Sequence, residues 1–110
     1  MNQEQFTEIL KNHIDHIEAT LGRKADEYAR GDRLSNFKDA AALMGCTPER
    51  ALFGFVSKHI IALSDFIKDL EDGKMRHRSQ WDEKIGDIAC YMPLLTALLV
   101  ERLREEKVVE

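Results

Sequence analysis

The stretch Thr47–Gly73, TPERALFGFVSKHIIALSDFIKDLEDG, decides the fold of this chain. Thr47 is a preferred N-cap residue, and Pro48 suits the first helical position because its missing N–H would have no helical partner there. From this start, apolar side chains recur every three or four residues, which predicts an amphipathic helix that ends near Gly73. Its apolar stripe consists of Leu52, Val56, His59, Leu63, Phe66 and Leu70.

The same helical period governs the N-terminal part of the chain. Apolar residues spaced by three or four predict one long helix over residues 3–30, bent near Gly22 because glycine weakens a helix. A short helix follows, capped by Ser35 or Asn36 and ended by Gly45, since glycine readily adopts the left-handed conformation that closes a helix.

The C-terminal part carries a further helix signal. A polar, basic loop covers residues 74–78, and Ser79 with Asp82 resembles a capping box that starts the last helix. This helix is expected to run to about Arg104. Pro93 lies inside it and removes one backbone donor, so we expect a kink there.

No segment alternates with the period of two that strands show, so the sequence predicts an all-α fold. We expect a compact helical bundle of three long helices and one short helix, forming a single domain over residues 1–110 with a charged, frayed tail over 105–110. Helices this long present more apolar surface than one small bundle hides, and Leu94, Leu98 and Val100 extend beyond the main stripe of the last helix. A homo-oligomer is therefore expected.

Composition narrows the class of protein. The chain has 110 residues, 44% of them hydrophobic, with a net charge of −4. The acidic balance argues against a dedicated nucleic-acid binder, and no apolar run is long enough to span a membrane. The N-terminus lacks the pattern of a signal peptide, and Cys46 and Cys90 fit neither a zinc spacing nor a disulfide framework. We expect a cytoplasmic protein.

Two pairs of carboxylates are the first candidates for chemistry. Glu83 and Asp87 are four residues apart, as are Asp65 and Asp69 on the preceding helix, so each pair shares one helix face. If the two helices pack antiparallel, both pairs lie near the connecting loop, where four oxygens suit Mg²⁺. The alternative is a solvated face on which lysines such as Lys58 pair with the carboxylates.

Cationic and aromatic side chains surround this end of the predicted hairpin. The charged residues could contact phosphates, and the aromatic residues could contact a nucleotide base. Alternatively, the basic loop is a solubilising turn, Lys58 forms a salt bridge, and the aromatic side chains belong to an ordinary core. The candidates for phosphates are Lys58, Arg76, Arg78 and Lys84, and those for a base are Trp81, Tyr91 and Phe37.

Several segments resemble proteins of known families. YARGDRLSNFK at 28–38, TPERAL at 47–52 and Lys58-His59 with Asp65 resemble small bacteriophage and prophage proteins. WDEKIGDIACY at 81–91 resembles the last core helix of the nucleotide modification associated domain of the first type. More distantly, it resembles the all-α, MazG-like nucleoside triphosphate pyrophosphatases.

This resemblance implies a MazG-like bundle that binds a nucleotide and, with Mg²⁺, hydrolyses a triphosphate to a monophosphate and pyrophosphate. It implies Asp87 as the acidic residue of the closing motif and Glu83 as its catalytic companion. The chain lacks the family's Glu-Glu-x-x-Glu cluster and has Cys90 where the first family has asparagine. Whether the protein is an enzyme thus stays open. The alternatives are a non-catalytic phage protein that blocks a host defence protein or sequesters a nucleotide, and a structural interaction module.

Overall fold

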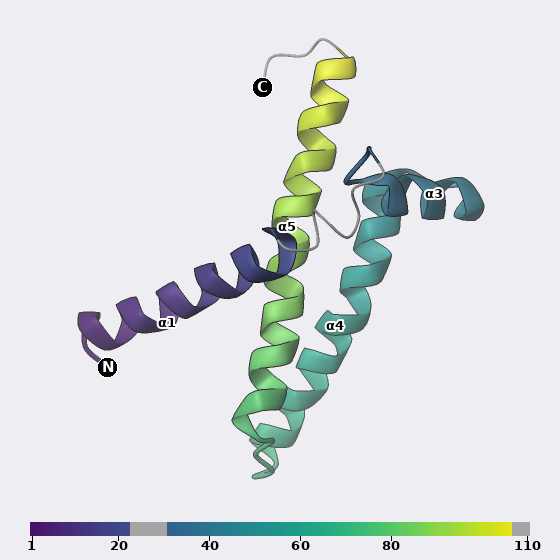
Figure 1. The fold of residues 1–110 in the computed structure, drawn as a ribbon. Coiled ribbons are helices and arrows are strands. Elements are labelled where there is room, and N and C mark those ends of the chain that lie inside the picture. The colour runs from purple at the N-terminus through teal and green to yellow at the C-terminus, as the bar shows by residue number, and fades with distance from the viewer. Residues whose placement is uncertain (23–30, 107–110) are drawn as a thin grey trace. The chain divides into compact units, whose positions relative to one another are not determined.

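The computed structural model describes residues 1–22 and 31–106, and every regular element in these ranges is helical (Figure 1). The all-α prediction is therefore confirmed for the described residues. None of the described helices combines the length and apolar character of a membrane-spanning segment. The elements are α1 (Gln3–Ile17), the π-helical turn η1 (Glu18–Gly22), α3 (Ser35–Met44), α4 (Pro48–Glu71) and α5 (Arg78–Glu105).

The chain divides into two compact units, Met1–Arg33 and Leu34–Glu110, which are described separately. In the first, the Asn2 side chain accepts a hydrogen bond from the Gln5 N–H at 2.8 Å and caps α1. The predicted long helix is confirmed over Gln3–Ile17, and a π-helical turn over Glu18–Gly22 continues it to the position where we expected a bend. Its expected continuation over residues 23–30 lies outside the described residues, and a single domain stays a prediction.

Helix α4 begins and ends as its sequence predicts. The Thr47 hydroxyl accepts a hydrogen bond from the Arg50 N–H at 3.1 Å, and Pro48 is the first helical residue. Gly73 follows the helix with a φ of +82°, a conformation that favours glycine. These local signals suffice because each of them acts on the helix end itself.

Helix α3 starts differently from its prediction. Ser35 is already helical, and Leu34 is the N-cap without any side-chain hydrogen bond, so the expected cap at Ser35 or Asn36 is wrong. Leu34 is buried in the core, and its carbonyl accepts the Phe37 N–H at 3.1 Å. Burial of an apolar side chain thus positions the start, while Gly45, with a φ of +67°, ends the helix as predicted.

The start of α5 also corrects the sequence analysis. The N-cap is His77, whose Nδ1 accepts the Ser79 N–H at 3.1 Å and whose own N–H donates to Gln80 Oε1 at 3.2 Å. The capping box expected from Ser79 and Asp82 is therefore wrong. The helix continues through Pro93 to Glu105, and residues 107–110 of the expected tail lie outside the described residues.

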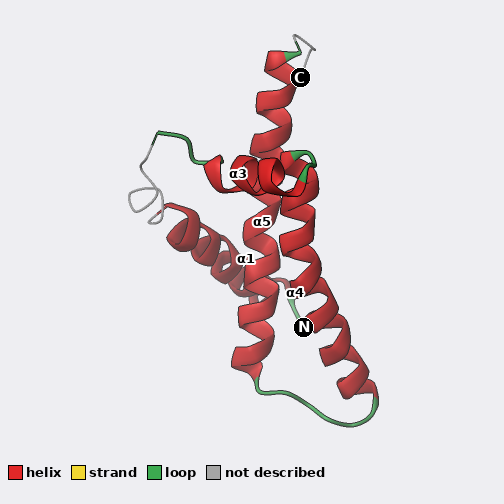
Figure 2. Cartoon of the chain, turned by 90° about the vertical axis from the view of Figure 1, so that its right-hand side faces the viewer, coloured by secondary structure: helices red, strands yellow, loops and turns green. Residues whose placement is uncertain are grey.

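Helices α4 and α5 form an antiparallel hairpin joined by residues 72–77, and α3 crosses its open end (Figures 1 and 2). The rings of Phe37 on α3 and Phe55 on α4 meet edge to face, 6.0 Å apart. The buried cluster of this unit consists of Leu34, Phe37, Leu52 and Leu98, with Tyr91, Leu94 and Leu95 packed against it. Leu94 and Leu98 are thus part of the unit's own core and do not supply the surface from which we expected an oligomer.

An ion pair ties the open end of the hairpin together. The Arg102 guanidinium on α5 donates two hydrogen bonds to the Glu49 carboxylate on α4, at 2.5 and 2.8 Å. These bonds favour the charged carboxylate, so they hold the pKa of Glu49 below its ordinary value of 4.5. This stabilisation is present above pH 4.5 and is lost as the pH falls through the lowered pKa of the folded protein.

We expect Leu52→Ala to lower the free energy of unfolding by about 2–5 kcal/mol, because Leu52 is the most completely buried large side chain of the core. Urea denaturation followed by circular dichroism measures this change. The matched control is Leu43→Ala, since Leu43 is 90% exposed and its truncation should leave the denaturation midpoint almost unchanged. Equal effects of the two substitutions would contradict the position of the core.

The ion pair gives a second expectation. Glu49→Gln should lower the melting temperature at pH 7 by a few degrees, and by progressively less as the pH falls through the lowered pKa of the wild-type carboxylate, because that group then also becomes neutral. Melting curves across this pH range check it. The same pH dependence in both proteins would show that the Glu49 carboxylate does not titrate with folding.

Candidate functional site

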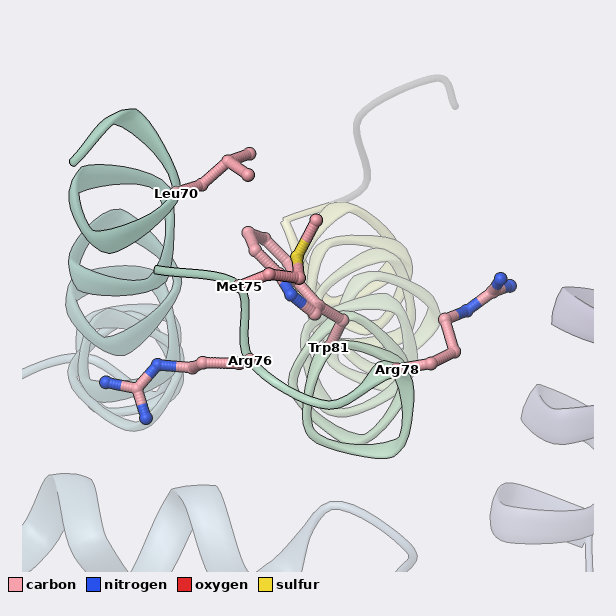
Figure 3. A pocket seen from close by; sticks show the side chains of 5 residues that line it. All are labelled: Leu70, Met75, Arg76, Arg78 and Trp81. Carbon is pink, nitrogen blue, oxygen red and sulfur yellow. The ribbon is translucent and has the colours of Figure 1, made fainter. Parts of the chain in front are cut away.

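A pocket of about 390 Å³ lies at the tip of the hairpin, within the 300–1,000 Å³ range of small-molecule sites. Figure 3 shows Leu70 of α4 on one side of it and Met75 beside the Trp81 indole on the other. Apolar atoms make up most of the wall. The lining residues are Leu70, Met75, Arg76, Arg78 and Trp81.

Arg76 is held in place from two directions. Its guanidinium lies over the Phe66 ring, 4.2 Å from the ring centroid, and its Nη2 donates to Asp69 Oδ2 at 2.8 Å. The Phe66 ring in turn meets the Trp81 indole edge to face at 5.5 Å. Together these contacts hold the Arg76 guanidinium beside the rings of Phe66 and Trp81 without any ligand.

Two N–H groups at the pocket have no acceptor. Arg76 Nε and Trp81 Nε1 are both buried and find no hydrogen-bond partner among the described residues. A buried donor without an acceptor is unfavourable, and most such groups in proteins are paired. The tip of the hairpin therefore contains two unpaired donors within its packed side chains.

Arg78 lies differently from Arg76. Figure 3 shows the two guanidinium groups extending in opposite directions, so they do not converge on one point. The Arg78 Nε donates to Asp82 Oδ1 at 2.8 Å on the exposed surface of α5, and this hydrogen bond raises the pKa of Arg78. Arg78 thus lines the pocket, while its guanidinium extends away from it along the exposed surface of α5.

A second polar group lies between the helices, around His59 of α4. Its Nδ1 is 3.3 Å from Lys84 Nζ and 3.6 Å from Asp87 Oδ2, and its ring centroid is 5.7 Å from that of Tyr91. Burial raises the pKa of the Tyr91 phenol, and the neighbouring Asp87 carboxylate raises it further. Lys84, Asp87 and Tyr91 thus join a polar layer of the interhelical contact and do not line the pocket.

The four carboxylates predicted to hold Mg²⁺ do not form a ligand set. Asp69 is paired with Arg76, Asp87 lies beside His59, and both Asp65 and Glu83 are exposed. Over residues 1–22 and 31–106, no three histidine, cysteine, aspartate or glutamate side chains come close enough to share a metal ion. These residues do not fit a magnesium centre as they stand.

Two further candidates lie away from the pocket. Lys58 is exposed on α4, and Phe37 is buried beneath α3 in the hydrophobic cluster. The packing of Phe37 leaves no room for a base against its ring, because the side chain is only 6% exposed.

Sequence analysis did not single out Leu70 and Met75. Leu70 belongs to the apolar stripe of this helix, yet it is 43% exposed at the tip. Met75 stands alone as an apolar residue in a basic loop and is 70% exposed. Met75, an apolar residue between Lys74 and Arg76, is therefore the sequence signal that could have indicated the pocket.

No protein-family model, curated protein or solved structure matches this chain significantly.

Proposed function

We propose that the tip of the α4–α5 hairpin binds a nucleotide. The observation that carries this proposal is the pocket itself, which joins an apolar aromatic wall to a fixed arginine and two unpaired N–H donors. The base lies against Trp81 and Met75, and the phosphates lie toward Arg76 and the basic loop.

Physical chemistry supports this division of the site. Stacking of a base on an aromatic side chain contributes about 1–3 kcal/mol and needs a flat apolar wall of the kind that Trp81 offers. The loop over residues 74–78 carries three permanent positive charges, in a chain whose net charge is −4. A guanidinium in this loop binds phosphate oxygens through charge-assisted hydrogen bonds.

The proposal is for binding, and catalysis is not part of it. A MazG-like pyrophosphohydrolase needs acidic metal ligands, whereas Asp69 at the tip is occupied by Arg76. The arrangement therefore favours the second of our hypotheses, a phage-type protein of the bacterial cytoplasm that sequesters a nucleotide. Blocking of a host protein stays an alternative that no feature of the pocket supports.

Intrinsic fluorescence tests the site directly, because Trp81 is the single tryptophan of the chain. We expect nucleoside triphosphates to quench its emission with saturation, and Arg76→Ala to weaken binding at least about tenfold, since a hydrogen bond to a charged group contributes about 1.5–3 kcal/mol. The matched control is Arg50→Ala, because Arg50 is an exposed arginine at the opposite end of α4 and should leave binding unchanged.

A parallel assay separates binding from turnover. Pyrophosphate release is followed for ribo- and deoxynucleoside triphosphates with Mg²⁺ or Mn²⁺, and we expect none above the blank. Saturable quenching with no release supports the proposal. Quenching that is absent for every nucleotide, or equal in Arg76→Ala and wild type, would contradict it, and release that Asp87→Ala abolishes would restore the enzyme hypothesis.

A further inference from the structure

Two rows of side chains, each with a spacing of seven residues, meet between α4 and α5. Leu52 and Leu98 share the buried cluster, and the rings of His59 and Tyr91 lie 5.7 Å apart. A spacing of seven residues is two helical turns, so each row follows one line along its helix. The rows are Leu52, His59 and Phe66 on α4, and Lys84, Tyr91 and Leu98 on α5.

The residue that follows each member of these rows along the chain is apolar. One of these six side chains is half-buried and the other five are exposed. One step along a helix turns the side chain by about 100°. Because α4 and α5 run in opposite directions, this turn brings both new rows to the same side of the hairpin. We call this the apolar face, and it consists of Phe53, Ile60, Ile67, Ile85, Met92 and Leu99.

The apolar face is exposed along both helices. Phe53, Ile60 and Ile67 are 53%, 46% and 42% exposed, and Met92 and Leu99 are 44% exposed each. The other side of the hairpin is covered at its open end by α3, through the Phe37–Phe55 ring contact and the Lys38–Glu101 ion pair. An apolar strip of this length on one side alone is unusual for a chain that acts as a monomer.

The polar groups bordering the apolar face are already satisfied. The Ser57 hydroxyl donates to the Phe53 carbonyl at 2.6 Å, and the Thr96 hydroxyl donates to the Met92 carbonyl at 3.2 Å. The corresponding places in the next helical turns hold Ser64 and Ala89, which are small and uncharged. Water can thus leave this surface without leaving a charge or these hydroxyls unpaired.

We propose that a second copy of this chain covers the apolar face, so that two α4–α5 hairpins form a four-helix bundle. The face is two helices wide, and a two-fold axis places two such faces against each other. Each of the four helices then contributes apolar side chains that recur every seven residues, the repeat found in four-helix bundles. At 1.5 Å per residue and about 10 Å per helix, it measures about 400 Å² in projection on each copy. Two copies thus bury about 800 Å² before the corrugation of the helices is counted, which lies in the size range of weak or transient complexes, below about 1,200 Å².

Light scattering after size exclusion tests this with a pair of adjacent substitutions. We expect the wild-type chain at micromolar concentration to have twice the 12.7 kDa mass of one chain. Ile60→Glu puts a charge in the middle of the apolar face and should raise the dissociation constant at least about a hundredfold, giving a monomer. Ile61→Glu is the matched control, because Ile61 is 63% exposed but turned away from the apolar face, and it should stay a dimer.

Met92→Glu repeats the test on α5, and circular dichroism establishes that each variant keeps its helix content. Should Ile60→Glu fail to fold, Met92→Glu decides the question. A wild-type monomer would overturn the proposal and would mean that another segment or another protein covers the face. Dimers that persist in both Ile60→Glu and Met92→Glu would also overturn it.

Discussion

The antiparallel contact between α4 and α5 is the interaction on which the rest of this unit depends. Leu52 and Leu98 bury the apolar part of that contact, and Glu49 and Arg102 join the two helices at the open end. The turn that closes the hairpin then places the Arg76 loop beside Trp81 at the opposite end. A hairpin with so small a core leaves a pocket at its tip and apolar side chains exposed along one side.

The parts of the fold that follow from local signals could be predicted from the sequence. Thr47, Pro48 and Gly45 act on the helix ends next to them, and the structure has them in those roles. The starts of α3 and α5 could not be predicted in this way. At Leu34 burial in the core sets the helix start, and at His77 an imidazole takes the place of the expected serine cap. Tertiary packing and an uncommon cap leave little trace in local composition.

The apolar pattern of α5 shows a second limit of sequence reasoning. The stripe through Met92 and Leu99 has the right period for a packing face, yet those side chains are exposed, and Leu98 is buried instead. A helix that is apolar over a wide arc has two possible packing faces, and periodicity does not say which of them the chain itself covers. The carboxylates show a similar limit. Spacing predicts that Asp69 shares a helix face with Asp65, but it does not show that the Asp69 carboxylate forms an ion pair with Arg76.

The indole N–H resonance of Trp81 tests the central claim, nucleotide binding at the hairpin tip, most directly. As the single tryptophan, Trp81 gives one indole cross-peak in a ¹⁵N-correlated NMR spectrum, and its Nε1–H has no acceptor in the described part of the protein. On titration with a nucleoside triphosphate, we expect this cross-peak and the Met75 and Arg76 amides to shift together and to saturate. Shifts confined to residues around His59, or no shift at the tip with any nucleotide, would contradict the account.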